Sequence, residues 1–132
     1  MATRATSSFT VDSWDEDPFD EREGAKLTRT RLTKTFRGDI EGTTTGEFLM
    51  AYAAEEVSAG YVGLDRFSGS VHGRSGGFVL QHAATADRGT QSARLTVVPD
   101  SATGELRGLR GEAEIVIAPD GGHTIILDYE LG

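Results

Sequence analysis

The sequence contains no cysteine, which excludes disulfide bonds, thiolate catalysis and cysteine-based zinc sites together. It has only three prolines, and none of its apolar runs approaches the roughly 18 residues that a membrane helix needs. The N-terminal segment MATRATSSFTVD also lacks the apolar core of a secretory signal, so we expect a cytoplasmic protein with no membrane partner. A chain of 132 residues, 37% of them hydrophobic, predicts a single domain over residues 1–132.

Basic residues are fewer than acidic residues. The sequence has 13 Lys and Arg and 21 Asp and Glu, which gives a formal net charge of −8. A general nucleic-acid binder needs clustered basic side chains, so we expect no nucleic-acid partner. The charge is nevertheless uneven, since residues 12–23 are mostly acidic whereas residues 24–38 hold five Lys and Arg and no acid. Two interpretations are open: an anion site, or, more commonly, two segments that neutralise each other at the surface.

Alternating and Thr-rich segments predict a chain made almost entirely of β-strands. Residues 15–24, which are highly charged and include Pro18, are expected to form a loop, and residues 53–56 fit either one helical turn or a loop. The 17 glycines suit turns and strand twists. The predicted strands are residues 5–14, 25–37, 40–52, 61–67, 70–82, 90–98, 105–118 and 123–131.

Eight strands with short connections predict an all-β fold, a single closed antiparallel eight-stranded barrel, because closure removes exposed strand edges. A two-sheet sandwich is the alternative. An eight-stranded barrel either fills its interior with side chains or holds one small ligand, and polar side chains that reach inward would indicate the second. Strands 40–52 and 105–118 are polar on both faces, and a bulge would reverse which face points inward. Only the last strand has a clear apolar, inward face, formed by His123, Ile125, Leu127, Tyr129 and Leu131.

Four segments stand out in order along the chain: FRGDIEG at 36–42, GRSGGFVLQH at 73–82, TGEL with GLRG within 103–111, and Asp128–Tyr129. Together they resemble a family of small bacterial proteins of unknown function that is similar in fold to plant allene oxide cyclase, an eight-stranded calycin-like barrel. The resemblance runs over nearly the whole chain, and it implies the barrel but no established activity. Its fold relatives include cyclases that steer a flexible substrate inside a barrel, which is an analogy of fold only.

The three histidines do not predict a metal site. His72 and His82 lie ten positions apart on one predicted strand, which separates them by about 33 Å if the strand is straight. His123 with nearby carboxylates makes a poor zinc site. We therefore expect no metal and no other cofactor.

The glycine-rich motifs are better explained by the bending of barrel strands than by chemistry. Residues 69–77 lack the Gly-Lys-Ser/Thr and the helix of a phosphate loop. Residues 108–111 match the GXXG of an RNA-binding KH domain, but they lie in a predicted strand of an acidic chain. Ser75, in GRSGG, lacks the spacing and the following helix of a nucleophile elbow.

His82 is the strongest single candidate for function. It ends a predicted strand that carries Phe78 and Leu80 on the same face, so we expect it at a barrel mouth beside an apolar wall. A neutral imidazole there exchanges protons near neutral pH. A structural histidine bonded to a neighbouring strand is the more frequent case.

The other candidates are polar or aromatic side chains on the same predicted strands. Glu47 and Arg110 join His82 as candidate catalytic groups, although an outward, solvated pair of Arg110 with Glu112 is the more frequent arrangement. Trp14 is large enough to plug one end of the barrel. The candidate ligand-binding residues are Tyr61, Phe78, Leu80, His82, Arg110, Glu112 and Tyr129, with core packing as the alternative for the tyrosines.

Three functions are compatible with these features. The first is a barrel that binds a small apolar or amphipathic molecule, anchored by a few polar groups. The second is a cofactor-independent cyclase or isomerase that works by orienting and desolvating its substrate. The third is a non-catalytic interaction module that forms a homo-oligomer.

Overall fold

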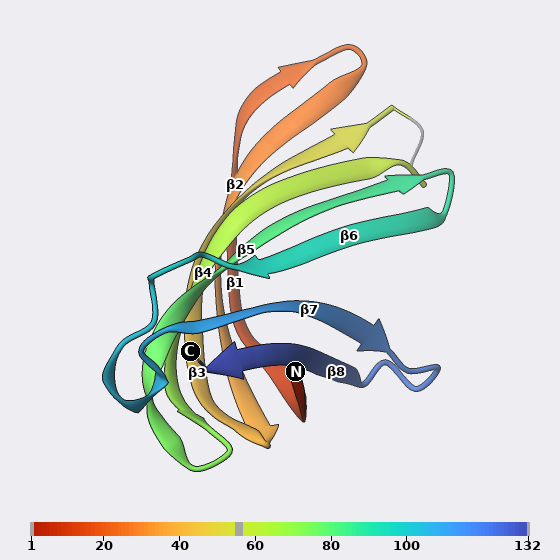
Figure 1. The fold of residues 1–132 in the computed structure, drawn as a ribbon. Helices are drawn as coiled ribbons and strands as arrows, with labels where there is room; N and C mark the ends of the chain where they lie inside the picture. The colour runs from red at the N-terminus through yellow and green to blue at the C-terminus, as the bar shows by residue number, and fades with distance from the viewer. Residues whose placement is uncertain (1, 55–56, 132) are drawn as a thin grey trace.

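The computed structural model describes residues 2–54 and 57–131, and its strands close into one antiparallel barrel in the order β1 to β8 (Figure 1). The predicted eight-stranded barrel is therefore confirmed. A short 3₁₀ turn, η1 (Gly104–Leu106), lies between β6 and β7. The strands are β1 (Thr3–Arg22), β2 (Ala25–Gly38), β3 (Ile40–Ala53), β4 (Ala59–Val71), β5 (Arg74–Asp87), β6 (Thr90–Val97), β7 (Leu109–Ile117) and β8 (His123–Leu131).

The first strand is longer than predicted, because residues 15–24 form the far half of β1 and its turn and not a loop. Two register shifts, between Val11 and Ser13 and between Pro18 and Asp20, accommodate the irregular sequence and its proline. This acidic half pairs with the basic strand β2 and sets opposite charges across the ladder, as in Asp15↔Arg31. The two segments thus neutralise each other, and cross-strand pairs of this kind stabilise the hairpin.

The β4–β5 hairpin turns at a different place from the one predicted. Ser68 and Gly69 continue β4, and the chain reverses at His72–Gly73, with φ angles of 48° and 79°. Two successive positive φ angles define the two-residue turn whose twist suits a hairpin. His72 therefore lies in a turn, and only His82 lies on β5. Residues 53–56, for which one helical turn or a loop was predicted, lie partly outside the described residues. Only Ala53, which ends β3, and Ala54 are described.

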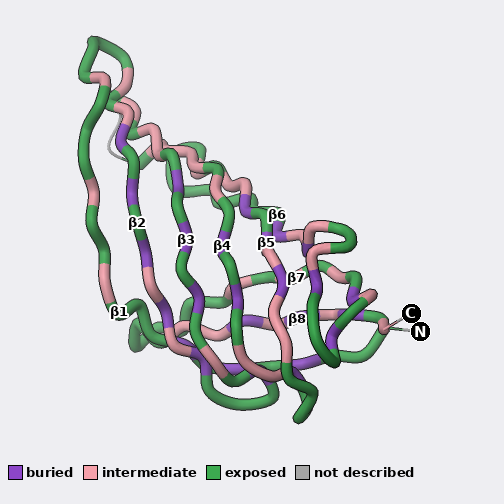
Figure 2. Tube along the Cα trace, turned by 90° about the vertical axis from the view of Figure 1, so that its left-hand side faces the viewer, coloured by how far each residue is buried: buried purple, intermediate pink, exposed green. Residues whose placement is uncertain are grey.

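One end of the barrel is filled by apolar side chains. Of the inward face predicted for β8, Ile125, Leu127 and Tyr129 are buried as expected, whereas His123 and Leu131 at the two ends of the strand are half-buried. Buried and exposed positions also alternate along β2 to β4, as Figure 2 shows. The space left among the core side chains at this end is about 20 Å³, roughly enough for one water molecule. We call this the closed end.

The opposite end is splayed, because two strand ladders stop early. The β6–β7 ladder contains only the pairs Leu95↔Ala113 and Thr96↔Glu112, and the β1–β8 ladder ends at Phe9↔His123. Beyond these points β1 to β6 continue as one curved sheet, while the β7–β8 hairpin diverges from it (Figure 1). Within the described ranges, the structure contains no helix long and apolar enough to cross a membrane.

Candidate functional site

A pocket of about 340 Å³ opens at the splayed end, and its walls are mainly apolar. Its mouth lies where the β6–β7 ladder is missing, since residues 91–93 of β6 and Ile115 and Ile117 of β7 line it from opposite sides. The remaining lining residues are Trp14 of β1, Met50 and Tyr52 of β3, Ala59, Gly60 and Tyr61 of β4, Ala84, Thr85 and Ala86 of β5, and Leu95 of β6.

The pocket exists because inward side chains become smaller toward the splayed end. Along β5 the inward positions are Phe78, Leu80, His82, Ala84 and Ala86 in turn. The large members fill the closed end, and the alanines leave room at the other. This gradient is visible in the sequence once the inward face is known.

A buried polar cluster of Lys34, Asp65 and His82 separates the packed core from the pocket. Lys34 Nζ lies 3.0 Å from Asp65 Oδ2, and His82 Nε2 lies 3.4 Å from the same oxygen. The three side chains are 7%, 1% and 2% exposed. Three strands, β2, β4 and β5, thus place a charge pair and an imidazole in the middle of the barrel.

Glycine and aromatic neighbours shape the space around this cluster. A Cβ on Gly46 would overlap Asp65 Oδ1, so only glycine at that position lets the carboxylate lie across β3. The Lys34 ammonium lies over the Phe48 ring, 5.4 Å from its centroid. The His82 ring meets Phe48 edge-on at 5.1 Å and lies 6.3 Å from the Tyr61 ring. His82 therefore lies one side-chain layer below Tyr61, which lines the pocket.

The protonation states in the cluster follow from burial and charge. Burial is the largest influence on His82 and lowers its pKa; Asp65 opposes this effect and Lys34 reinforces it, so the pKa lies below its usual value. Burial raises the pKa of Asp65, but its contacts with His82 and Lys34 together outweigh burial and hold the pKa below its usual value. At neutral pH the imidazole is therefore neutral and the carboxylate is charged.

Three buried polar atoms in and beside the cluster make no hydrogen bond to the described residues: Thr44 Oγ1, Asp65 Oδ1 and His82 Nε2. At 3.4 Å from Asp65 Oδ2, the Nε2 atom of the neutral His82 is too far away for a well-formed hydrogen bond. Unpartnered polar atoms are rare in protein interiors and are destabilising there. Their concentration at one place below the pocket favours a functional role for the cluster.

His82→Gln is expected to reduce the acid sensitivity of the fold. Because the pKa of His82 is lower in the folded protein than its value of about 6.5 in an unfolded chain, the unfolded state binds more protons as the pH falls through about 6.5. Stability is then lost at up to about 1.4 kcal/mol per pH unit. Asp65, whose folded pKa is also lowered, adds a loss only below about pH 5.

Urea unfolding of both proteins between about pH 5.5 and pH 8 measures this effect. We expect the wild-type protein to lose stability more steeply than His82→Gln below about pH 6.5. His72 and His123 are present in both proteins, so their contributions cancel. Parallel profiles would contradict a neutral, buried His82.

The structure places the predicted ligand-binding residues in different parts of the barrel. Tyr61 lines the pocket. His82 is not at the mouth, because β5 continues five residues beyond it to Asp87 and builds the pocket wall there. Phe78 and Leu80 do not line the pocket either; they belong to the packed core of the closed end.

Glu47, Arg110 and Glu112 do not reach the interior, which corrects their prediction as catalytic or binding groups. Glu47 lies between the buried residues Gly46 and Phe48, so its side chain points outward. It bonds Arg29 on the surface, with 2.7 Å between Arg29 Nη2 and Glu47 Oε1. Arg110 and Glu112 are likewise exposed on the outer face of β7.

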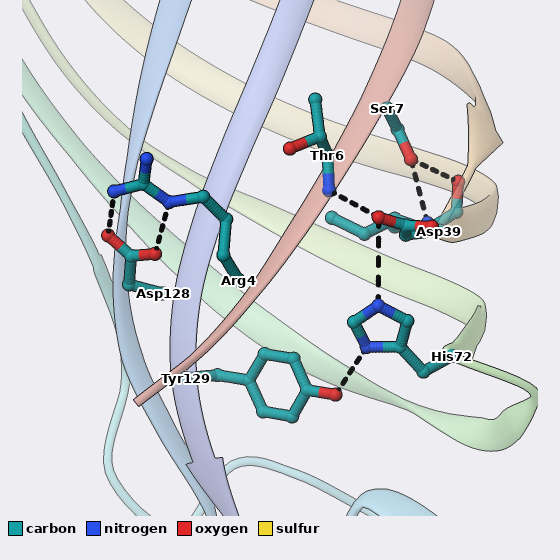
Figure 3. Close-up of polar contacts among 8 residues, drawn as sticks. Arg4, Thr6, Ser7, Asp39, His72, Asp128 and Tyr129 are labelled. Carbon is teal, nitrogen blue, oxygen red and sulfur yellow. Dashed lines mark hydrogen bonds and ion pairs between the residues drawn. The ribbon is translucent and has the colours of Figure 1, made fainter. Parts of the chain in front are cut away.

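Tyr129 belongs to the packed core of the closed end and does not line the pocket; Figure 3 shows its contact with His72. Its hydroxyl is 2.6 Å from His72 Nδ1, and His72 Nε2 is 3.6 Å from Asp39 Oδ2. Asp39 Oδ2 also accepts a hydrogen bond from the Thr6 backbone N–H. These contacts tie β8 and β1 to the turns between β2 and β3 and between β4 and β5, so Tyr129 stabilises the fold and is not a ligand contact. No three His, Cys, Asp or Glu side chains of the described part of the chain are placed to share a metal ion.

The sequence interpretation missed Glu16, which lies beside the pocket mouth. Glu16 Oε1 accepts a hydrogen bond from Trp14 Nε1 at 3.0 Å, and Oε2 accepts one from Thr28 Oγ1 at 2.6 Å. The Thr28 bond is the main cause that lowers the pKa of Glu16. Burial, and then the hydrogen bond with Glu16, raise the pKa of Tyr52 to about 12. Glu16 was missed because residues 15–24 were expected to form a loop; the alternation of Trp14 and Glu16 is the signal that the strand continues.

The fold and the pocket define a class: small, closed antiparallel barrels with a packed end and an apolar pocket at the splayed end. The chain belongs to the family described as "Protein of unknown function (DUF3224)", whose family model matches residues 5–129. It is also similar to the crystal structure, at 1.84 Å resolution, of a protein with unknown function from the DUF3224 family of Shewanella oneidensis MR-1. The identity is 36% and the TM-score 0.89, over 100% of this chain and 98% of that chain. A search of curated proteins found no match.

Proposed function

We propose that the protein binds one small, mainly apolar molecule in the pocket at the splayed end. The observation that carries this proposal is a cavity of about 340 Å³ with apolar walls, in a barrel whose other end is packed. Ligand pockets span about 300–1,000 Å³, so this volume suits a small ligand.

The exposure of apolar side chains at the mouth supports the same proposal. Trp14 is 50% exposed and Ile117 is 58% exposed, and both line the pocket. Apolar surface of this kind, gathered at a concave site, is stabilised when a ligand removes it from water.

Ala84→Phe is expected to weaken binding strongly without unfolding the barrel. Ala84 faces the cavity and pairs with Tyr61 of β4 and Ala93 of β6, which also line it, so a phenyl ring at this position would occupy the space of the ligand. Titration of a neutral fluorophore such as N-phenylnaphthylamine into both proteins measures this effect. We expect the Kd of Ala84→Phe to be at least about tenfold higher than that of the wild-type protein, a difference of about 1.4 kcal/mol.

Ala83→Phe provides the matched control, because Ala83 lies on the same strand with its side chain on the opposite face. It is expected to bind the fluorophore as the wild-type protein does. Equal affinities of Ala84→Phe and wild-type protein would contradict the proposed pocket. Native mass spectrometry of freshly purified protein, in which we expect a retained small molecule in wild-type but not in Ala84→Phe protein, identifies the natural ligand.

A second candidate is a cyclase or isomerase acting on the bound molecule, as the predicted likeness to allene oxide cyclase suggests. The observation that favours it is the buried cluster of Lys34, Asp65 and His82 directly below Tyr61. Burial, and then the Asp65 charge, raise the pKa of Tyr61, so its phenol is neutral at neutral pH and can donate a hydrogen bond to a substrate oxygen. Conversion of the retained molecule by wild-type protein, lost in Tyr61→Phe, would support this activity; no conversion by wild-type protein would argue against it.

A further inference from the structure

We propose that the ligand of this pocket is an amphipathic organic cation, bound with an alkylated ammonium group against the aromatic side chains of the mouth and its apolar body inside the cavity. This inference rests on the proposed function and names the class of ligand. Three independent features of the pocket carry it: its aromatic side chains, a carboxylate behind them, and the lack of any positive charge in its lining.

The first feature is the set of aromatic rings that three strands bring to one pocket. Trp14, Tyr52 and Tyr61 come from β1, β3 and β4 and all line the cavity. Trp14 and Tyr52 remain 50% and 37% exposed, so their rings are accessible to a ligand. The faces of aromatic rings attract cations, tryptophan most strongly, and groups of aromatic rings are a common way to bind quaternary ammonium ions.

The second feature is the carboxylate of Glu16, which lies behind two of these rings. It accepts hydrogen bonds from the Trp14 indole and from Thr28, and it contacts Tyr52. These donors fix the carboxylate in place and carry no charge themselves. The charge of the nearby Lys26 also lowers the pKa of Glu16, as the smallest of the causes, but among the described residues Lys26 forms its ion pair with Glu21, at 3.7 Å between Nζ and Oε1. A negative charge is therefore fixed at the mouth of the pocket.

The third feature concerns the other charges around the cavity. Among the described residues that line the pocket, none carries a formal charge. Below its floor, the positive charge of Lys34 is balanced by Asp65. An anionic ligand would find no counter-charge, whereas a cation would find Glu16, and the net charge of −8 would attract it from a distance.

The position of Glu16 also selects the kind of cation. Its carboxylate is not part of the cavity lining, so a primary ammonium would lose its water without gaining a direct hydrogen bond to it. An ammonium that carries methyl groups is less strongly hydrated and makes its contacts with the ring faces. The geometry thus favours an alkylated ammonium with an apolar chain.

Isothermal titration calorimetry with three probes that share one octyl chain tests the inference. The probes are octyltrimethylammonium, octanol and octanoate, which carry a positive charge, no charge and a negative charge. We expect wild-type protein to bind the cation at least about tenfold more tightly than octanol, which is the scale of desolvated cation–aromatic contacts, and to bind octanoate most weakly.

Glu16→Gln removes the charge and keeps an oxygen that accepts a hydrogen bond. We expect it to weaken cation binding by at least about threefold and to leave octanol binding within about twofold. Asp17→Asn changes the net charge equally on the same strand, but Asp17 is exposed opposite Arg29, so this control is expected to bind like the wild-type protein. Trp14→Leu, a second variant that leaves Glu16 intact, is expected to lose the cation preference too.

The outcomes separate the two proposals. If wild-type protein binds none of the three probes, the proposed function itself fails. If all three bind alike, or octanoate binds most tightly, apolar binding stands and the cation inference is overturned. Equal effects of Glu16→Gln and Asp17→Asn would also overturn it, because they would reflect net charge and not a carboxylate at the mouth.

Discussion

Asp65→Asn is expected to lower the free energy of unfolding by about 3–5 kcal/mol. The substitution keeps the shape of the side chain but leaves the Lys34 ammonium without its counter-charge in a place where it is only 7% exposed. Breaking a buried ion pair on one side is strongly destabilising, because the remaining charge has lost its water and gains no partner. Urea denaturation of the purified variant measures this change.

A double variant and a surface variant sharpen that test. Lys34→Met in the Asp65→Asn background removes the uncompensated charge, and we expect it to recover part of the lost stability. Glu47→Gln breaks the exposed pair with Arg29 and is expected to cost less than about 1 kcal/mol. If Asp65→Asn were as mild as Glu47→Gln, the charged, buried pair described above would be contradicted.

Gly69→Ala is expected to destabilise the barrel by about 1–3 kcal/mol or more. A Cβ at Gly69 would overlap the carbonyl oxygen of Glu41 and lie 2.7 Å from the Cα of Gly42, across the β3–β4 ladder. Both are backbone atoms of the partner strand, so the clash is relieved only by moving the two strands apart. Thermal and urea unfolding measure the loss.

Gly60→Ala is the matched control on the same strand. The nearest atoms to a Cβ at Gly60 are 3.5 and 3.6 Å away, which is ordinary van der Waals contact. We expect a change within about 0.5 kcal/mol, or slight stabilisation because alanine restricts the unfolded chain. Similar losses of stability in Gly69→Ala and Gly60→Ala would show that the close approach of β3 and β4 is not the reason for a glycine at position 69.

The sequence predicts the barrel well because its strongest signals are local. Strand β8 alternates cleanly, with Ile125, Leu127 and Tyr129 on one face, and this face is buried as expected. Strand β3 gave no such signal, because its inward face holds Thr44, Gly46 and Phe48 while Leu49 is exposed outside. The outward direction of Glu47 could therefore not be predicted from alternation.

The site was harder to predict because it depends on where strands stop. His82 was expected at a mouth, but the mouth is set by the early end of the β6–β7 ladder, and alternation does not reveal that end. Glu16 was hidden in a segment whose charge density is typical of loops, whereas pairing with the basic strand β2 keeps it extended. Interactions between distant segments decide both cases.

The central claim is that a small, mainly apolar ligand binds in the pocket at the splayed end, and an NMR titration tests it most directly. The chain has a single tryptophan, so the indole N–H resonance of Trp14 reports on the mouth without ambiguity. On addition of octanol or octyltrimethylammonium, we predict saturable shifts of this resonance and of the Ala84 and Ala93 methyl groups, which line the pocket. The methyl groups of Val71 and Leu106, in the packed core of the closed end, should not shift. Saturable shifts at the closed end alone, or no shifts with either probe, would contradict the account.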